Sequence, residues 1–236
     1  MSGYDGSKAT AVEIPFLPSN LYAIIDAATL RTHALTVADF ATQLRDAGVS
    51  LLQYRDKDSD PQAILRAAAE ISAVYEGVDA TLILNDRADL AALAGWGVHV
   101  GQEDLSPADV MVVLQTSSRF PEGMTKRKAA AGVIGVSTHS DDQVILANAT
   151  DADYIAVGPV FATSTKQNAS PVVGLEGVRR ARALTQKPIV AIGGITRENA
   201  RSVLDAGADS VAVIGGLFSA GESVEKVARD FLEILR

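Results

Sequence analysis

The stretch DYIAVGPVFATSTK, residues 153–166, is a strand pattern that runs directly into a polar loop. Residues 154–157 carry no charge, as expected for a parallel strand that is covered on both faces. A glycine-proline pair ends the run, and Thr163, Thr165 and Lys166 follow it. A lysine ammonium beside hydroxyl donors suits a phosphate or diphosphate, although a solvated loop has the same composition. The stretch therefore predicts a buried parallel strand that ends at an anion-binding loop.

The same alternation of a short apolar run and an Ala-rich amphipathic stretch continues along the chain. Strands are predicted over residues 21–26, 51–56, 81–86, 97–100, 133–138, 154–160, 188–194 and 210–216. Helices are predicted over residues 37–48, 61–75, 87–94, 107–115, 141–148, 175–184, 197–206 and 223–235. Eight such units with short connections predict an α/β protein, a closed (β/α)8 TIM barrel. An open doubly wound sheet is the alternative, because periodicity does not determine closure.

Local signals support several of these boundaries. Serine or aspartate followed by proline, at 106–107 and at 60–61, predicts an N-cap with proline in the first helical position. Gly48, Gly95 and Gly207 lie where helices should end. The boundaries therefore agree with the periodicity.

The length of the chain favours a single enzyme domain, and its composition includes no cysteine. A chain of 236 residues fits a single α/β barrel. We expect residues 20–236 to form the barrel, and residues 1–19, which show no period, to form a loose N-terminal arm. The absence of cysteine excludes disulfides and thiolate metal sites and fits a cytoplasmic protein. The sequence lacks a membrane-length apolar run and a secretory signal.

The charge balance restricts the partners. A net charge of −8 argues against a nucleic-acid binder, whose affinity comes mainly from neutralising phosphates. We expect small phosphorylated molecules instead, met by a few locally placed cations. The sequence leaves a homo-oligomer open.

A TIM barrel places its active site at the carboxyl ends of its strands. The second predicted strand ends in Gln53, Arg55 and Lys57, which alternate onto one face of an extended segment. An amide, a guanidinium and an ammonium are costly to bury unless they meet anions or acceptors. We interpret the row as an anion site; an ion-pair rim with Asp56 and Asp58 is the alternative.

Two carboxylates follow the third and fourth strands. Asp86 and Asp104 can approach each other, because the carboxyl ends of adjacent barrel strands lie together. Carboxylates without histidine or cysteine nearby suit Mg²⁺, which completes its coordination with water and substrate phosphate. The alternative is that Asp86 caps the following helix.

Two polar residues fall within or at the end of predicted strands. His99 lies late in a short buried strand, where a hydrogen-bonded core role is favoured over acid-base catalysis. Ser137 ends the fifth strand without an evident His-Asp relay, so hydrogen bonding is favoured over nucleophilic attack.

Glycine pairs end the last two strands, at 193–194 and 215–216. Glycine lets backbone N–H groups approach an anion closely, and barrels commonly bind phosphate after strands seven and eight. The pairs predict a second phosphate site, with tight turns as the alternative.

The ordered motifs resemble the thiamine-phosphate synthase family from residue 21 to the C-terminus. They are QYRDK (53–57), NDR (85–87), HVGQED (99–104), GVST (135–138), DYIAVGPVFATSTK (153–166), AIGGI (191–195) and VAVIGG (211–216). The resemblance implies a Mg²⁺-dependent TIM barrel that joins 4-amino-2-methyl-5-hydroxymethylpyrimidine diphosphate to 4-methyl-5-(2-phosphoethyl)thiazole and releases diphosphate. No side chain looks like an activated nucleophile, so we expect direct transfer.

The resemblance also assigns residues. It implies Mg²⁺ on Asp86 and Asp104. It implies catalytic roles for Arg55, Lys57, Ser137 and Lys166. The expected pyrimidine diphosphate contacts are Gln53, Tyr54, Arg55, Asp56, Lys57, Asn85, Ser137 and Lys166. The expected thiazole phosphate contacts are Thr163, Ser164, Thr165, Gly194, Ile214 and Gly215.

Two departures from the family pattern stand out. The family commonly carries serine where this chain has Gly215, and residues 116–131 form a longer connection than usual. A related thiazole tautomerase and a non-catalytic sensor of thiamine intermediates are the competing interpretations.

Overall fold

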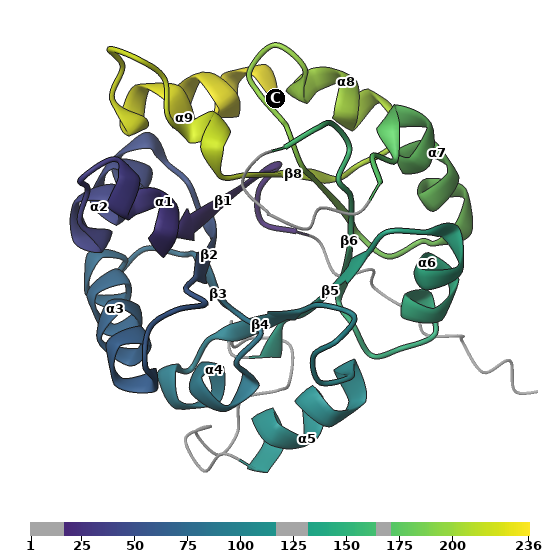
Figure 1. Ribbon diagram of the computed structural model, residues 1–236, viewed down its shortest axis with the longest axis horizontal. Helices are drawn as coiled ribbons and strands as arrows, with labels where there is room; N and C mark the ends of the chain where they lie inside the picture. The colour runs from purple at the N-terminus through teal and green to yellow at the C-terminus, as the bar shows by residue number, and fades with distance from the viewer. Residues whose placement is uncertain (1–16, 117–131, 164–170) are drawn as a thin grey trace, which may run out of the picture.

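The computed structural model describes residues 17–116, 132–163 and 171–236, and within them eight parallel strands form a closed barrel in sequence order. Figure 1 looks into the barrel, whose helices form an outer ring. The strands are β1 (Leu21–Asp26), β2 (Leu51–Arg55), β3 (Thr81–Asn85), β4 (Gly97–Val100), β5 (Ile134–Thr138), β6 (Tyr154–Val157), β7 (Ile189–Ile192) and β8 (Ser210–Val213). The helices are α1 (Ala27–Thr32), α2 (Val37–Ala47), α3 (Pro61–Val74), α4 (Ala88–Ala94), α5 (Pro107–Thr116), α6 (Asp141–Asn148), α7 (Gly174–Leu184), α8 (Ala200–Asp205) and α9 (Val224–Ile234).

The closure of the sheet decides between the two predicted architectures. The first and last strands pair in parallel, with Leu21 opposite Val211 and Ala23 opposite Val213. This pairing confirms the TIM barrel and excludes the open doubly wound sheet.

Apolar side chains fill two layers, as strand alternation requires. Tyr22, Ile24, Leu51, Ile83 and Tyr154 belong to the cluster inside the barrel. A larger cluster lies between the sheet and the helices. Both faces of every strand are therefore covered, which explains the uncharged strand sequences.

The predicted caps are present. Asp60 caps α3 by accepting a hydrogen bond from Ala63 N at 2.9 Å, with Pro61 in the first helical turn. Ser106 Oγ accepts from Asp109 N at 3.2 Å at the start of α5. Gly48 ends α2 in the left-handed region with φ 93°.

Some predicted boundaries were wrong. The helix predicted over residues 197–206 is only α8, and residues 197–199 before it form a turn in which Asn199 Oδ1 accepts from Thr196 N at 2.8 Å. The strand predicted over 154–160 ends at Val157, and α1, which Asp26 caps, was not predicted.

The N-terminal segment joins the barrel slightly earlier than predicted. Residues 1–16 lie outside the described residues. Leu17 is buried against the interior cluster, and Asn20 Nδ2 donates to Leu235 O at 2.8 Å. Residues 17–19 are thus attached to the barrel, whose start was predicted at residue 20. Among the helices of the described ranges, none has the length and apolarity needed to cross a membrane.

Candidate active site at the barrel mouth

The carboxyl-terminal end of the barrel, called the mouth below, gathers the charged residues that follow β1 to β4. Leu51 belongs to the interior cluster, so alternation turns Gln53 and Arg55 of β2 inward as well. Arg55 Nη1 donates to Asp26 Oδ2 at 2.5 Å, and Asp26 is only 3% exposed. The same Asp26 caps α1 by accepting from Thr29 N at 2.8 Å. One buried carboxylate at the end of β1 therefore fixes both the guanidinium of Arg55 and the start of α1.

Asp26→Asn should lower kcat/KM by about tenfold to 100-fold, because a misplaced binding group costs that much without touching the reaction centre. Asparagine still caps a helix, so α1 should persist. Steady-state kinetics with varied pyrimidine diphosphate, together with circular dichroism, measures both effects. Asp58→Asn is the matched control, since Asp58 is exposed and pairs with exposed Arg31 at 2.7 Å. Equal losses in the two variants would show that positioning of Arg55 is unimportant.

Asp86 has a backbone conformation that few side chains adopt. Its φ is 61°, in the left-handed region that disfavours residues other than glycine, asparagine and aspartate. The backbone N–H of Asp86 donates to His99 O at 2.7 Å, which joins the end of β3 to β4. The helix α4 has Arg87 as its N-cap, without a side-chain capping bond. The alternative interpretation of Asp86 as a helix cap is therefore wrong.

The side chain of Asp86 meets both a cation and a second acid. Its Oδ2 lies 3.0 Å from Lys57 Nζ, and the carboxyl group of Asp104 is near enough to interact with it. Asp104 Oδ2 is held by Gly101 N at 2.8 Å. Burial, above all, and the neighbouring charge of Asp104 raise the pKa of Asp86, while Lys57 opposes the rise. The two carboxyl groups therefore lie near each other, as predicted, and the charge of Asp104 adds to the effect of burial on Asp86.

Two residues of the predicted pyrimidine site point elsewhere. Tyr54 packs in the layer between sheet and helices and donates to Asp56 Oδ2 at 3.0 Å. Asp56 Oδ1 also accepts from Asp58 N and Ser59 N, each at 3.1 Å. These two side chains thus stabilise the loop after β2 and do not face inward as Gln53 and Arg55 do. Their placement does not support contact with the substrate.

Below the mouth, five interior side chains form a continuous hydrogen-bond network across the barrel. Gln53 Nε2 donates to Tyr22 Oη at 2.9 Å, and Tyr22 Oη and Tyr154 Oη are 2.9 Å apart. His99 Nδ1 lies 2.9 Å from Tyr154 Oη, and His99 Nε2 lies 2.8 Å from Ser137 Oγ. The favoured hydrogen-bonded role of His99 is therefore correct, and Ser137 is the member closest to the mouth.

The ends of β6 and β7 are joined through their backbones. Val160 N donates to Ile192 O at 2.8 Å and Phe161 N to Gly193 O at 2.9 Å. Gly194 has φ 63°, and a Cβ there would lie 2.5 Å from Ala162 O. The glycine pair thus permits a close approach of two loops. Thr163 lies just beyond this contact, whereas Ser164, Thr165 and Lys166 fall outside the described residues.

After β8, the predicted phosphate site consists of backbone. Ile214 leads into a 3₁₀ turn over Gly215–Leu217. Arg197, which follows β7, is bound to Glu222 and Asp230 at 2.5 Å each, and Arg197 with Lys226 lowers the pKa of Glu222 to about 2. Because Arg197 is held by these acids, a phosphate here would depend on backbone N–H groups.

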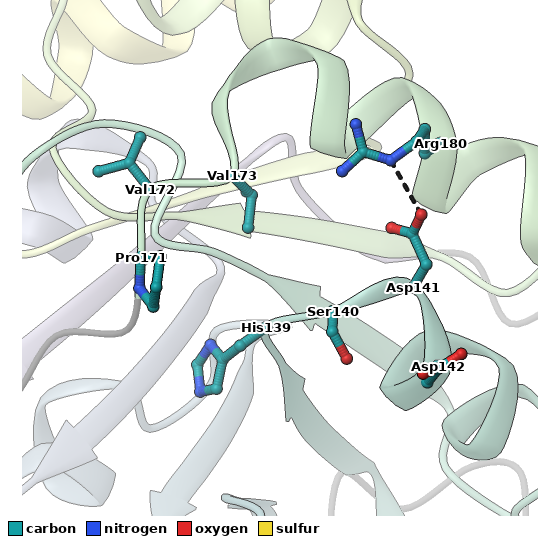
Figure 2. A pocket seen from close by; sticks show the side chains of 8 residues that line it. All are labelled: His139, Ser140, Asp141, Asp142, Pro171, Val172, Val173 and Arg180. Carbon is teal, nitrogen blue, oxygen red and sulfur yellow. Dashed lines mark hydrogen bonds and ion pairs between the residues drawn. The ribbon is translucent and has the colours of Figure 1, made fainter.

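A hollow of about 430 Å³ lies beside the mouth, between the start of α6 and the segment before α7. Figure 2 shows Arg180 pointing to Asp141, a pair joined at 2.9 Å, and His139 and Pro171 on the opposite wall. None of the predicted site residues that the structure describes lines it. The hollow is therefore separate from the row on β2 to β4.

Sequence reasoning did not single out Asp26, Tyr22 and Tyr154. One signal was available for Asp26, because an acid that ends a buried strand must find a partner. No local signal distinguished the two tyrosines from other strand residues, because their contact forms across the barrel interior.

The closed barrel with charged strand ends defines a TIM-barrel enzyme whose active site lies at the mouth. Residues 21–217 match the family model described as thiamine monophosphate synthase. The chain is 46% identical to a thiamine-phosphate synthase of Koribacter versatilis, over 96% of this chain and 99% of that one. It is 39% identical to that of Methanoregula boonei, over 91% and 92%. A solved thiamine phosphate pyrophosphorylase of Pyrococcus furiosus superposes with TM-score 0.76 at 27% identity, over 92% and 95%. The chain belongs to the thiamine-phosphate synthase family of transferases.

Proposed function

We propose that this barrel joins 4-amino-2-methyl-5-hydroxymethylpyrimidine diphosphate to 4-methyl-5-(2-phosphoethyl)thiazole, giving thiamine monophosphate and diphosphate. The observation that carries the proposal is the convergence of Arg55, Lys57, Asp86 and Asp104 on one side of the mouth. Two cations and two acids at the carboxyl ends of adjacent strands suit a diphosphate ester with a divalent cation. The family membership supports the same reaction.

The donor set fits Mg²⁺. Asp86 and Asp104 present two neighbouring carboxyl groups, and a cation between them would offset both the burial and the repulsion that raise the pKa of Asp86. The described residues contain no group of three or more His, Cys, Asp or Glu side chains suited to a metal ion, so water and phosphate oxygens would complete the coordination. When bound, Mg²⁺ would neutralise diphosphate oxygens and make diphosphate a better leaving group.

The residues of the chain would then act mainly by charge and position. Arg55, which Asp26 holds in place, and Lys57 stabilise the negative charge that develops on diphosphate as the C–O bond breaks. The electron-rich aminopyrimidine carries the resulting methylene cation, and the thiazole nitrogen captures it. Lys166 is proposed as a further diphosphate ligand, and Asn85 and Ser137 as pyrimidine contacts. Thr163, Ser164, Thr165, Gly194, Ile214 and Gly215 are proposed for the thiazole phosphate.

The experiment that tests this proposal mixes both phosphorylated substrates with Mg²⁺ and detects thiamine monophosphate by mass. The same mixtures without pyrimidine diphosphate, without thiazole phosphate or with EDTA should give none. Aromatisation of a thiazole tautomer alone would favour a tautomerase. Thermal stabilisation by the substrates without diphosphate release would favour a sensor, and either result would overturn the proposal.

A further inference from the structure

The interior network of Gln53, Tyr22, Tyr154, His99 and Ser137 has a direction that follows from its donors and acceptors. Gln53 donates from its amide nitrogen, so Tyr22 Oη accepts at 2.9 Å. The remaining partner of Tyr22 Oη is Tyr154 Oη, to which the Tyr22 hydroxyl must donate. Tyr154 then accepts from Tyr22 and has its own proton to give to His99 Nδ1.

The last bond follows from the one before it. A neutral imidazole that accepts at Nδ1 carries its proton on Nε2. His99 Nε2 therefore donates to Ser137 Oγ, 2.8 Å away. With one lone pair of Ser137 occupied in this way, its hydroxyl hydrogen is left to point toward the mouth. Among the described ranges, Ser137 Oγ has no second protein partner.

Burial keeps the hydrogen-bond network intact. Tyr22 is 1% exposed and Tyr154 is 0% exposed, and burial raises the pKa of both phenols, so each keeps the single proton that the count requires. Tyr154 also packs against its two neighbours, edge-on to Tyr22 at 6.0 Å and stacked on His99 at 5.6 Å between ring centroids. The rings therefore have little freedom to exchange partners.

We propose that this network holds His99 in the Nε2–H tautomer and makes Ser137 a hydrogen-bond donor toward the pyrimidine substrate. An aminopyrimidine offers a ring nitrogen as acceptor and an amino group as donor. A donating Ser137 would select the ring nitrogen and so orient the pyrimidine in the mouth. This inference rests on the proposed function for the identity of the ligand, while the tautomer can be measured without it. Gln53, Tyr22, Tyr154 and His99 are positioning residues in this account.

The tautomer is tested by ¹⁵N-labelled protein without substrates. Two-bond ¹H–¹⁵N correlations distinguish the Nε2–H, Nδ1–H and doubly protonated rings, and the chain contains only 3 histidines. The signal that disappears in His99→Gln belongs to His99. If that variant does not fold, His33→Gln and His139→Gln assign the other two histidines and so leave the signal of His99. We expect Nε2–H. An Nδ1–H ring would mean that the amide of Gln53 is reversed and every bond runs the other way, which would overturn the proposal.

The functional part is tested by Tyr154→Phe, which removes one oxygen from a fully enclosed ring. Without its donor to His99, the orientation of Ser137 is lost, and kcat should fall about tenfold to 100-fold while KM for the pyrimidine changes less than about threefold. Tyr75→Phe is the matched control, since Tyr75 is also buried and donates to Val49 O at 3.1 Å outside the network.

The outcomes separate the two proposals. An unchanged kcat in Tyr154→Phe, or an equal loss in Tyr75→Phe, would overturn the positioning role. A wild-type protein with the Nε2–H ring but without synthase activity would sink the proposed function and leave the tautomer assignment supported.

Discussion

Replacing Asp86 with asparagine should lower kcat by about 100-fold to 1,000-fold, because it removes one preorganised charge from the proposed Mg²⁺ and diphosphate site. Asparagine has nearly the same shape and tolerates the left-handed backbone that φ 61° demands. The substitution therefore tests the charge and leaves the turn intact. Steady-state kinetics at several Mg²⁺ concentrations should also show that the variant needs more Mg²⁺ than the parent protein to reach half of its maximal rate.

The same variant should be at least as stable as the parent protein. A carboxyl whose pKa is raised in the folded state binds its proton more tightly there than in the unfolded chain. Its contribution to stability is then present below the ordinary pKa of 3.8 and is lost as the pH rises through the raised value. At neutral pH, Asp86→Asn avoids this cost, so Tm in the absence of Mg²⁺ should not fall. Added Mg²⁺ should raise Tm of the parent protein more than that of the variant.

Two further variants complete the test. Asp89→Asn makes the same charge change three residues away, on a carboxylate that is 58% exposed and paired with Arg87, and kcat should change less than about twofold. Asp104→Asn should resemble Asp86→Asn, and the double variant should lose little more, because groups that act as one unit are not additive. A full additive loss would argue against a shared cation.

Much of this arrangement could be predicted from local sequence rules. Alternation placed Gln53 and Arg55 on one face of β2, and the adjacency of β3 and β4 brought Asp86 near Asp104. These predictions needed only strand periodicity and barrel order. The end of each strand was harder to place, because a glycine does not always end the backbone pairing of a strand. After β6, for example, backbone hydrogen bonds to the neighbouring segment continue beyond the last strand residue.

The rest depended on contacts that no local pattern encodes. Tyr22 and Tyr154 lie on β1 and β6, which do not pair with each other, and they meet only because the closed barrel has an interior. The strand sequence is apolar on both faces, so periodicity could not tell which way Tyr154 points. The left-handed backbone at Asp86 is likewise set by the turn from β3 into α4. An aspartate permits this conformation but does not require it.

Gly135→Ala should be the most destabilising single substitution within the barrel interior. Gly135 lies opposite Tyr154 in the pairing of β5 and β6, and a Cβ there would lie 2.0 Å from Tyr154 Cζ and 2.3 Å from its hydroxyl oxygen. A ring enclosed on all sides cannot give way by that much, because interiors are close-packed. We expect a loss of at least about 3 kcal/mol in the free energy of unfolding, or roughly 10 °C in Tm.

Chemical denaturation and a double-mutant cycle measure this coupling. Gly221→Ala is the comparison, because nothing lies within 4 Å of a Cβ there and only its φ of 79° opposes alanine, at a cost of about 1–2 kcal/mol. Tyr154→Leu removes the ring, so Gly135→Ala should cost at least about 2 kcal/mol less in that background than in the parent protein. The double variant should nevertheless remain poorly active, because the link from Tyr22 to His99 is gone. Additive losses of stability would mean that the backbone of β5, and not the tyrosine ring, excludes a side chain at residue 135.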